Sequence, residues 1–195
     1  RRGEYADSVA VCRGVSRKRH ACVVRRTRNY WNSDYSYAIA MKSYFVGAYW
    51  GSRRESREAC AERIAQLLSR LAPLHPGLAA WQKKGRSARS ASRVVDTTVS
   101  AIQNAFTENR RDIDKSVIPE LGLSLFLWNG SRGGFDVSLD VTCGSFAEKL
   151  GNFAVVSFSA RSVPSLDLLQ GILSASIHAF DPDDDGDVDL LLRSR

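Results

Sequence analysis

The feature that most constrains the fold is a pair of alternating segments separated by a glycine-rich connection. Leucines occupy every second position between residues 121 and 127, and a second apolar alternation runs over residues 135–142. An apolar residue at every second position is typical of a strand with one buried face. The connection, Asn129–Gly134, is rich in residues that tolerate positive φ, so the two segments predict an antiparallel hairpin.

Further segments complete the predicted sheet. Residues 42–50 are aromatic and apolar, and residues 153–160 continue the strand pattern after the hairpin. We therefore place a first strand at about 42–50 and a β-meander at about 121–160. Because helical patterns lie between and after these strands, we predict an α+β fold, in which an antiparallel-dominated sheet has helices packed on one face.

Three stretches carry apolar residues at helical spacing, and each predicts an amphipathic helix that packs on the sheet. The first has the pattern of a capping box, with Glu55 three residues after Ser52, so we predict its start there. The second runs from about Val95 to Asn109, and the third follows Pro164.

Between the first two helices the sequence predicts only short structure. Trp81 opens a stretch that ends near Gly85, and we predict that this stretch is helical. Residues 86–93 are rich in serine and arginine and lack an apolar pattern, which predicts a solvated loop.

The net charge of +7 is concentrated at one end of the chain. Residues 1–40 hold nine of the 28 basic and three of the 21 acidic residues, so they carry +6 and the other 155 residues carry +1. Met41, the single methionine, lies at this boundary. We therefore expect a basic extension over 1–40 that is non-native or disordered, a folded domain over 41–180, and an acidic tail over 181–195.

Two alternative functions follow from the charged segments. The basic extension would suit a nucleic-acid arm, whose binding would weaken steeply with salt. The tail, Asp181–Asp189, places acids and a glycine as in the first half of a calcium loop. The twelfth position, where a bidentate glutamate belongs, is Leu192. Our leading interpretation is that the tail is solvated and binds no metal. We also expect the protein to have no other cofactor and no nucleic-acid partner.

Known catalytic motifs are missing from the sequence. It contains no Gly-x-Ser-x-Gly elbow, no His-Glu-x-x-His pair and no Walker loop. His75 and His178 have no fixed partner in sequence, and Asp112–Lys115 approaches the acid and lysine pattern of a nuclease with the wrong spacing. We therefore predict a protein that binds another protein. A small enzyme that uses His178 or Asp112 is the alternative.

Two features bear on the compartment. No apolar run approaches the roughly 20 residues that a membrane-spanning helix needs. Of the four cysteines, Cys60 lies in an apolar helical pattern and Cys143 at the end of an alternating strand, and none has metal-binding spacing. We therefore expect buried or half-buried free thiols at these two positions, and a cytoplasmic protein without membrane contact.

A series of short motifs runs in order through residues 41–180. They are Gly47–Gly51, Arg54, Glu55, Cys60–Arg63, Trp81, Gly85, Asn109–Asp112, Glu120–Gly122, Leu127–Gly130, Cys143, Gly144 and Asn152. In this order the motifs resemble the immunity protein 52 family of bacterial polymorphic-toxin systems. Members of that family continue past Phe180 with more folded sequence, so we expect this chain to be truncated or altered there.

The resemblance implies a protein that binds and neutralises a cognate toxin, typically a nuclease with a restriction-endonuclease-like fold. The implied mechanism is stoichiometric occlusion without catalysis, and the oligomeric state is left open. Nucleases present basic clefts, so local acids would steer the association. The matching motifs supply the candidate partner-binding residues, which are Trp50, Arg54, Glu55, Arg110, Asp112, Trp128 and Asn129.

Several of these candidates have a scaffold role as the alternative. Trp50 ends a predicted strand and would also suit the core. Trp128 ends a strand at a hairpin, where it would either pack on the sheet edge or stand exposed as an anchor. Asn129 fits the chemistry of the turn. Arg110 and Asp112 follow a predicted helix end and would also suit an internal ion pair.

Overall fold

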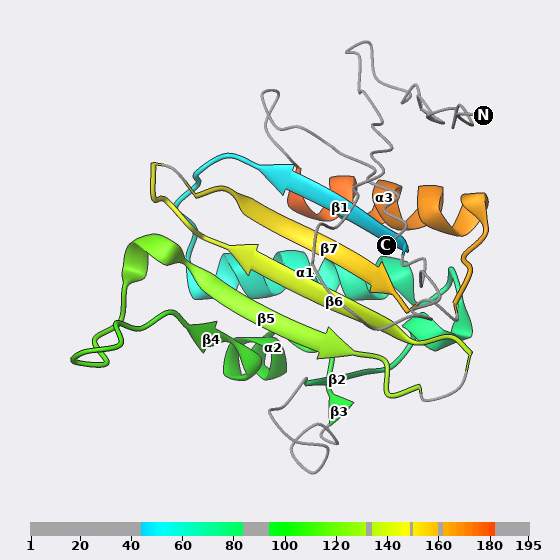
Figure 1. Cartoon of the computed structure of the whole chain (residues 1–195), viewed down its shortest axis with the longest axis horizontal. Coiled ribbons are helices and arrows are strands. Elements are labelled where there is room, and N and C mark those ends of the chain that lie inside the picture. Colours follow the sequence, from blue (N-terminus) through cyan, green and yellow to red (C-terminus); the bar gives the residue numbers. More distant parts are fainter. Residues whose placement is uncertain (1–43, 84–93, 132–133, 149, 160–161, 182–195) are drawn as a thin grey trace, which may run out of the picture.

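The computed structural model describes residues 44–83, 94–131, 134–148, 150–159 and 162–181. These residues form a seven-stranded antiparallel sheet and three α-helices (Figure 1), which confirms the predicted α+β class. In chain order the elements are β1 (Tyr44–Trp50), α1 (Arg57–Leu71), β2 (Trp81–Lys83), β3 (Val94–Val95), α2 (Val99–Ala105), β4 (Thr107–Glu108), β5 (Leu123–Trp128), β6 (Val137–Cys143), β7 (Asn152–Phe158) and α3 (Leu166–Phe180).

The order of strands in the sheet is β1-β7-β6-β5-β2-β3, and β4 also pairs with β5. The predicted meander is therefore confirmed as β5, β6 and β7, while β1 pairs with β7 so that Trp50 lies opposite Asn152. Along its other edge β5 has two partners, because β4 pairs with its start and β2 with its end. At one end of the sheet β1 and β6 finish while β5 and β7 begin, as Figure 1 shows on the left.

The core lies between the sheet and the helices. Every second residue of β6 and β7 is buried, as the alternation predicts for a strand with one covered face. Helices α1 and α3 contact each other and lie behind the sheet in Figure 1, and α2 packs against α1. The buried face of α1 consists of Cys60, Ala61, Ile64, Leu67, Leu68 and Leu71, which follow the helical period of about 3.6 residues.

The predicted N-cap of the first helix, Ser52, lies four residues before the observed one. Helix α1 begins at Arg57, and Ser56 is its N-cap, because the Ser56 hydroxyl accepts a hydrogen bond of 3.1 Å from the backbone N–H of Ala59. Glu55, the residue expected to close a capping box with Ser52, instead forms an ion pair with Arg63. A partner eight residues away on α1 therefore replaces the expected one.

The prediction of a helical piece at Trp81 is wrong, and the second helix is shorter than predicted. Trp81 begins strand β2, in which it lies opposite Val95 of β3. Helix α2 spans Val99–Ala105 because the residues before and after it join the sheet as β3 and β4. Edge pairing thus overrides the local helical pattern. The predictions for residues 1–40, 86–93 and 182–195 lie outside the described residues.

The two cysteines in the described part of the chain are buried free thiols, which confirms the prediction for Cys60 and Cys143. A hydrogen bond with Cys60, and secondly burial, raise the pKa of the Cys143 thiol. Because both thiols are buried, and reaction requires an accessible thiolate, we expect iodoacetamide at mildly alkaline pH to leave both residues unmodified in the native protein. Peptide mass mapping with and without denaturant measures this, and alkylation of native Cys143 would contradict its burial.

Candidate functional site

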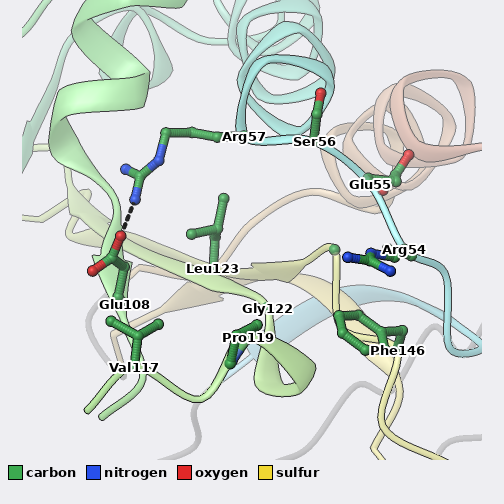
Figure 2. Close-up of a pocket in the computed structure, with 11 residues that line it drawn as sticks. Arg54, Glu55, Ser56, Arg57, Glu108, Val117, Pro119, Gly122, Leu123 and Phe146 are labelled. Atoms are coloured by element: carbon green, nitrogen blue, oxygen red, sulfur yellow. Dashed lines mark hydrogen bonds and ion pairs between the residues drawn. The ribbon is translucent and has the colours of Figure 1, made fainter. Parts of the chain in front are cut away.

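A pocket of about 490 Å³ lies at the end of the sheet where β1 and β6 finish (Figure 2). Three segments line it, namely the link from β1 to α1, the segment from β4 to the start of β5, and the turn after β6. Its apolar lining comes from Val117, Pro119, Leu123 and Phe146. Its charged lining comes from Arg54, Glu55, Arg57 and Glu108.

Two glycines allow the strands to meet closely beside this pocket. Gly122 and Gly144 both have positive φ, at 67° and 72°. A Cβ atom on Gly122 would lie 2.5 Å from the carbonyl oxygen of Cys143 and from the nitrogen of Ser145. A side chain is therefore excluded at Gly122. The close approach of the backbone explains the glycine of the Glu120–Gly122 motif.

Asn152 joins the segments around the pocket from inside. Its side chain is buried, and its Nδ2 donates to the carbonyl oxygens of Gly51 at 2.7 Å and Ser145 at 3.1 Å. Its Oδ1 accepts a hydrogen bond of 2.8 Å from the backbone N–H of Ser145. A fully satisfied buried amide holds the β1–α1 link and the turn after β6 in one arrangement, so Asn152 supports the site without lining it.

The acidic residues of the pocket are engaged in ion pairs. The Glu55 side chain is only 7% exposed and lies 2.7 Å from Arg63 Nε and 3.4 Å from Arg53 Nε. Glu108 pairs with Arg57, as the dashed line in Figure 2 shows, and its Oε2 lies 2.8 Å from Arg110 Nη2. Both carboxylates are therefore neutralised by arginines, which leaves the predicted acid Glu55 little charge or surface for a partner.

Arg54 differs from the other charged residues of the pocket. Its side chain is exposed, and its guanidinium lies 5.0 Å from the ring centroid of Phe146 (Figure 2). Within the described part of the chain Arg54 forms no ion pair. The aromatic ring holds the cation at the pocket while its hydrogen-bond donors stay available, an arrangement that suits a carboxylate.

Arg110 and Asp112 lie in a hairpin that adjoins the pocket. The hairpin covers residues 109–118, and a backbone bridge joins Arg110 to Val117, which lines the pocket. Asp112 is exposed on this hairpin. Four predicted site residues, from two segments distant in the sequence, are therefore gathered at this end of the sheet: Arg54, Glu55, Arg110 and Asp112.

Trp50 is close to this end of the sheet but belongs to the core. Its side chain is 2% exposed and stacks on Phe180 of α3, with ring centroids 4.6 Å apart and an interplanar angle of 22°. In this arrangement the indole presents almost no surface to a partner.

Trp128 and Asn129 lie at the opposite end of the sheet, where β5 finishes. Trp128 is half-buried, and its Nε1 donates a hydrogen bond of 2.8 Å to Asp136. Asn129 Nδ2 donates to the carbonyl oxygens of Gly77 and Phe135, at 3.1 and 2.8 Å. The structure therefore separates these two residues from the other candidates, and it places Asn129 in the framework of the turn.

The sequence alone did not point to Phe146 or Val117 as parts of the site. Phe146 follows a motif that ends at Gly144, and neither residue belongs to a periodic apolar pattern. Their common surface arises only when the turn after β6 comes beside the 109–118 hairpin. The weak signal available was an apolar residue within an otherwise polar turn.

Comparison with protein-family models assigns the class of this protein as an immunity protein, which neutralises a cognate toxin. The matching model is immunity protein 52, and it covers residues 42–185. Because the match spans more than half of the sequence, the chain belongs to the immunity protein 52 family. Such proteins typically act by binding and not by catalysis. A search of curated proteins found no match.

The described residues were also searched for membrane and metal features. None of their helices is long and apolar enough to cross a membrane. They include no group of three or more His, Cys, Asp or Glu side chains arranged to hold a metal ion. Apart from Asp181, the segment considered as a calcium loop lies outside these residues.

Proposed function

We propose that the protein neutralises a nuclease toxin in the bacterial cytoplasm by stoichiometric occlusion, and that the pocket end of the sheet faces the toxin. The proposal extends the family assignment by naming the kind of toxin and the contact surface. It rests on Arg54, which lines the pocket, and on the hairpin of Arg110 and Asp112, which adjoins it through Val117.

The observation that carries the contact surface is the state of Arg54. Its guanidinium is exposed and lacks an ionic partner among the described residues, whereas the other charged residues lining the pocket are paired. An arginine can bind a carboxylate through two parallel hydrogen bonds. We therefore propose that a carboxylate of the toxin binds Arg54 and that an apolar group beside it fills the pocket over Val117 and Phe146.

The rigidity of this end of the sheet supports an occlusion mechanism. Asn152 and the Glu55–Arg63 ion pair hold the segments around the pocket, so little conformational entropy is lost on binding. A preformed surface that covers the nuclease cleft excludes the DNA without any chemical step. Such pre-organised complexes reach nanomolar affinity or tighter.

Titration of the full chain against the toxin domain encoded by the adjacent gene tests this function. We expect one-to-one binding by calorimetry and a loss of DNA cleavage that is complete at one equivalent, because occlusion requires one inhibitor per toxin. Inhibition at far less than one equivalent would indicate catalysis and contradict occlusion. A toxin that is bound but cleaves neither DNA nor RNA would contradict the nuclease assignment and leave the immunity class intact.

A further inference from the structure

The tip of the 109–118 hairpin carries a large apolar side chain that no described residue covers. Ile113 is 99% exposed, although an isoleucine is among the residues most often buried in proteins. Figure 1 shows the hairpin projecting from the domain between β4 and the start of β5. Since Ile113 stabilises no core, its apolar character has no explanation within the fold.

The hairpin is ordered by its own backbone hydrogen bonds. The N–H of Arg111 donates to the carbonyl oxygen of Ser116 at 2.9 Å, and the N–H of Lys115 donates to that of Arg111 at 3.1 Å. The N–H of Ile118 donates to the carbonyl oxygen of Asn109 at 2.9 Å and closes the base of the hairpin. The tip is therefore held in one arrangement in spite of its exposure.

Side chains reinforce this arrangement. Asp114 Oδ1 accepts hydrogen bonds from the hydroxyl of Ser116 at 2.8 Å and from its backbone N–H at 3.0 Å, and these bonds lower the pKa of Asp114. The stabilisation of the hairpin by these bonds is present at a pH above the pKa of an unfolded aspartate. It is lost as the pH falls through the lower pKa of the folded state. Arg110 links the hairpin to the pocket, because it donates to the carbonyl oxygen of Lys115 and pairs with Glu108.

A single exposed apolar residue is ordinary on a protein surface. Ile113 differs in three respects: it is almost wholly exposed, it stands on an ordered projection, and the same hairpin places Val117, 40% exposed, at the pocket. Two cations and two anions surround it in sequence, namely Arg111, Asp112, Asp114 and Lys115. An apolar centre with a polar rim of both signs is the arrangement of a binding hot spot.

We propose that this hairpin is an anchor that inserts Ile113 into an apolar cavity on the toxin, with charged groups of both signs around the mouth of that cavity. The proposal rests on the proposed function, because it names a surface of the same partner. An ordered hairpin enters such a cavity with little loss of conformational entropy, and the isoleucine loses its whole hydration shell on entry.

Replacement of Ile113 by alanine tests the anchor. We expect the Kd for the toxin domain to rise about 10- to 100-fold, mainly through faster dissociation, since most of a buried apolar side chain is removed. Ile113→Asp should weaken binding further, because a charge would enter the cavity unpaired. The melting temperature should not change, because Ile113 is 99% exposed and packs against no described residue. Binding kinetics by surface plasmon resonance and thermal melts of the full chain provide these values.

Leu166→Ala is the matched control, because it removes a similar aliphatic side chain that is 55% exposed at the start of α3, at the other end of the sheet. Binding of this variant should equal that of the wild type. Wild-type affinity in Ile113→Ala and Ile113→Asp, together with weakened binding in Arg54→Glu, would overturn the anchor and leave the proposed function standing. A wild-type chain that does not bind the toxin would overturn both. A homodimer that dissociates in Ile113→Ala would show that a second copy occupies this surface, which also overturns the anchor.

Discussion

Replacement of Arg54 by glutamate is expected to raise the Kd for the toxin by about 100-fold or more, because the toxin carboxylate would face a like charge in place of a guanidinium. Protection of DNA in a cleavage assay should fall in proportion. The fold should be unaffected, since Arg54 is exposed and forms no ion pair among the described residues. Calorimetric titration and a thermal melt of the same preparation measure the two effects.

Arg70→Glu is the control for this charge reversal. Arg70 is exposed in the last turn of α1, away from the pocket, and the substitution changes the net charge by the same amount. Because a glutamate at a helix C-terminus opposes the helix dipole, a slight loss of stability is expected, with binding unchanged. Equal weakening by the two variants would mean that Arg54 acts only through the overall charge, and the contact would be rejected. Restoration of Arg54→Glu binding by a toxin carboxylate changed to lysine would identify the partner group.

Replacement of Trp50 by alanine should lower the free energy of unfolding by about 3–5 kcal/mol, the range for an aromatic side chain removed from a core. The side chain is buried, stacks on Phe180 and finds no hydrogen-bond partner for Nε1 among the described residues, so the loss arises from packing. Trp50→Phe keeps an aromatic ring at that position and should lose much less. Urea denaturation followed by circular dichroism gives both values.

The same measurement on Trp128→Ala compares the two tryptophans taken from the sequence motifs. Trp128 is half-buried and hydrogen-bonded to Asp136 at the other end of the sheet, so its removal should destabilise less than the removal of Trp50. A larger loss in the free energy of unfolding for Trp128→Ala than for Trp50→Ala would show that the stack of Trp50 on Phe180 contributes less to stability than its burial implies.

The sequence predicted the central part of the fold because the signal there is local. A strict two-residue period marks β6 and β7, and a change of register by one residue would expose their buried face. The short strands β2, β3 and β4 have only two or three residues each, too few for a period. Strands β2 and β4 pair with the open edge of β5, and β3 pairs with β2, but a sequence does not display which edge is open.

The site was predicted less completely, since exposure depends on tertiary partners. Arg54 and Glu55 are adjacent in the sequence, but Glu55 is buried by Arg63 from the next helix and Arg54 is not. Trp50 matched a motif because it serves the core. Ile113 gave no signal, because a lone apolar residue in a charged loop belongs to no pattern. Motifs thus marked the region of the site, while the division between scaffold and surface required the structure.

Because β1 pairs with β7, the last strand in the sequence, newly synthesised chains cannot complete the sheet, and so cannot neutralise toxin, until β7 has been made. The hydrogen bond from Asn152 to Gly51 joins residues 101 positions apart, and among the described strands β1 pairs only with β7. Contacts of such long range slow folding. At a synthesis rate of about 5–20 residues per second, a nascent β1 waits about 5–20 seconds on the ribosome before β7 exists. Under the proposed one-to-one stoichiometry, a cell under attack depends on the stock of chains that were already folded.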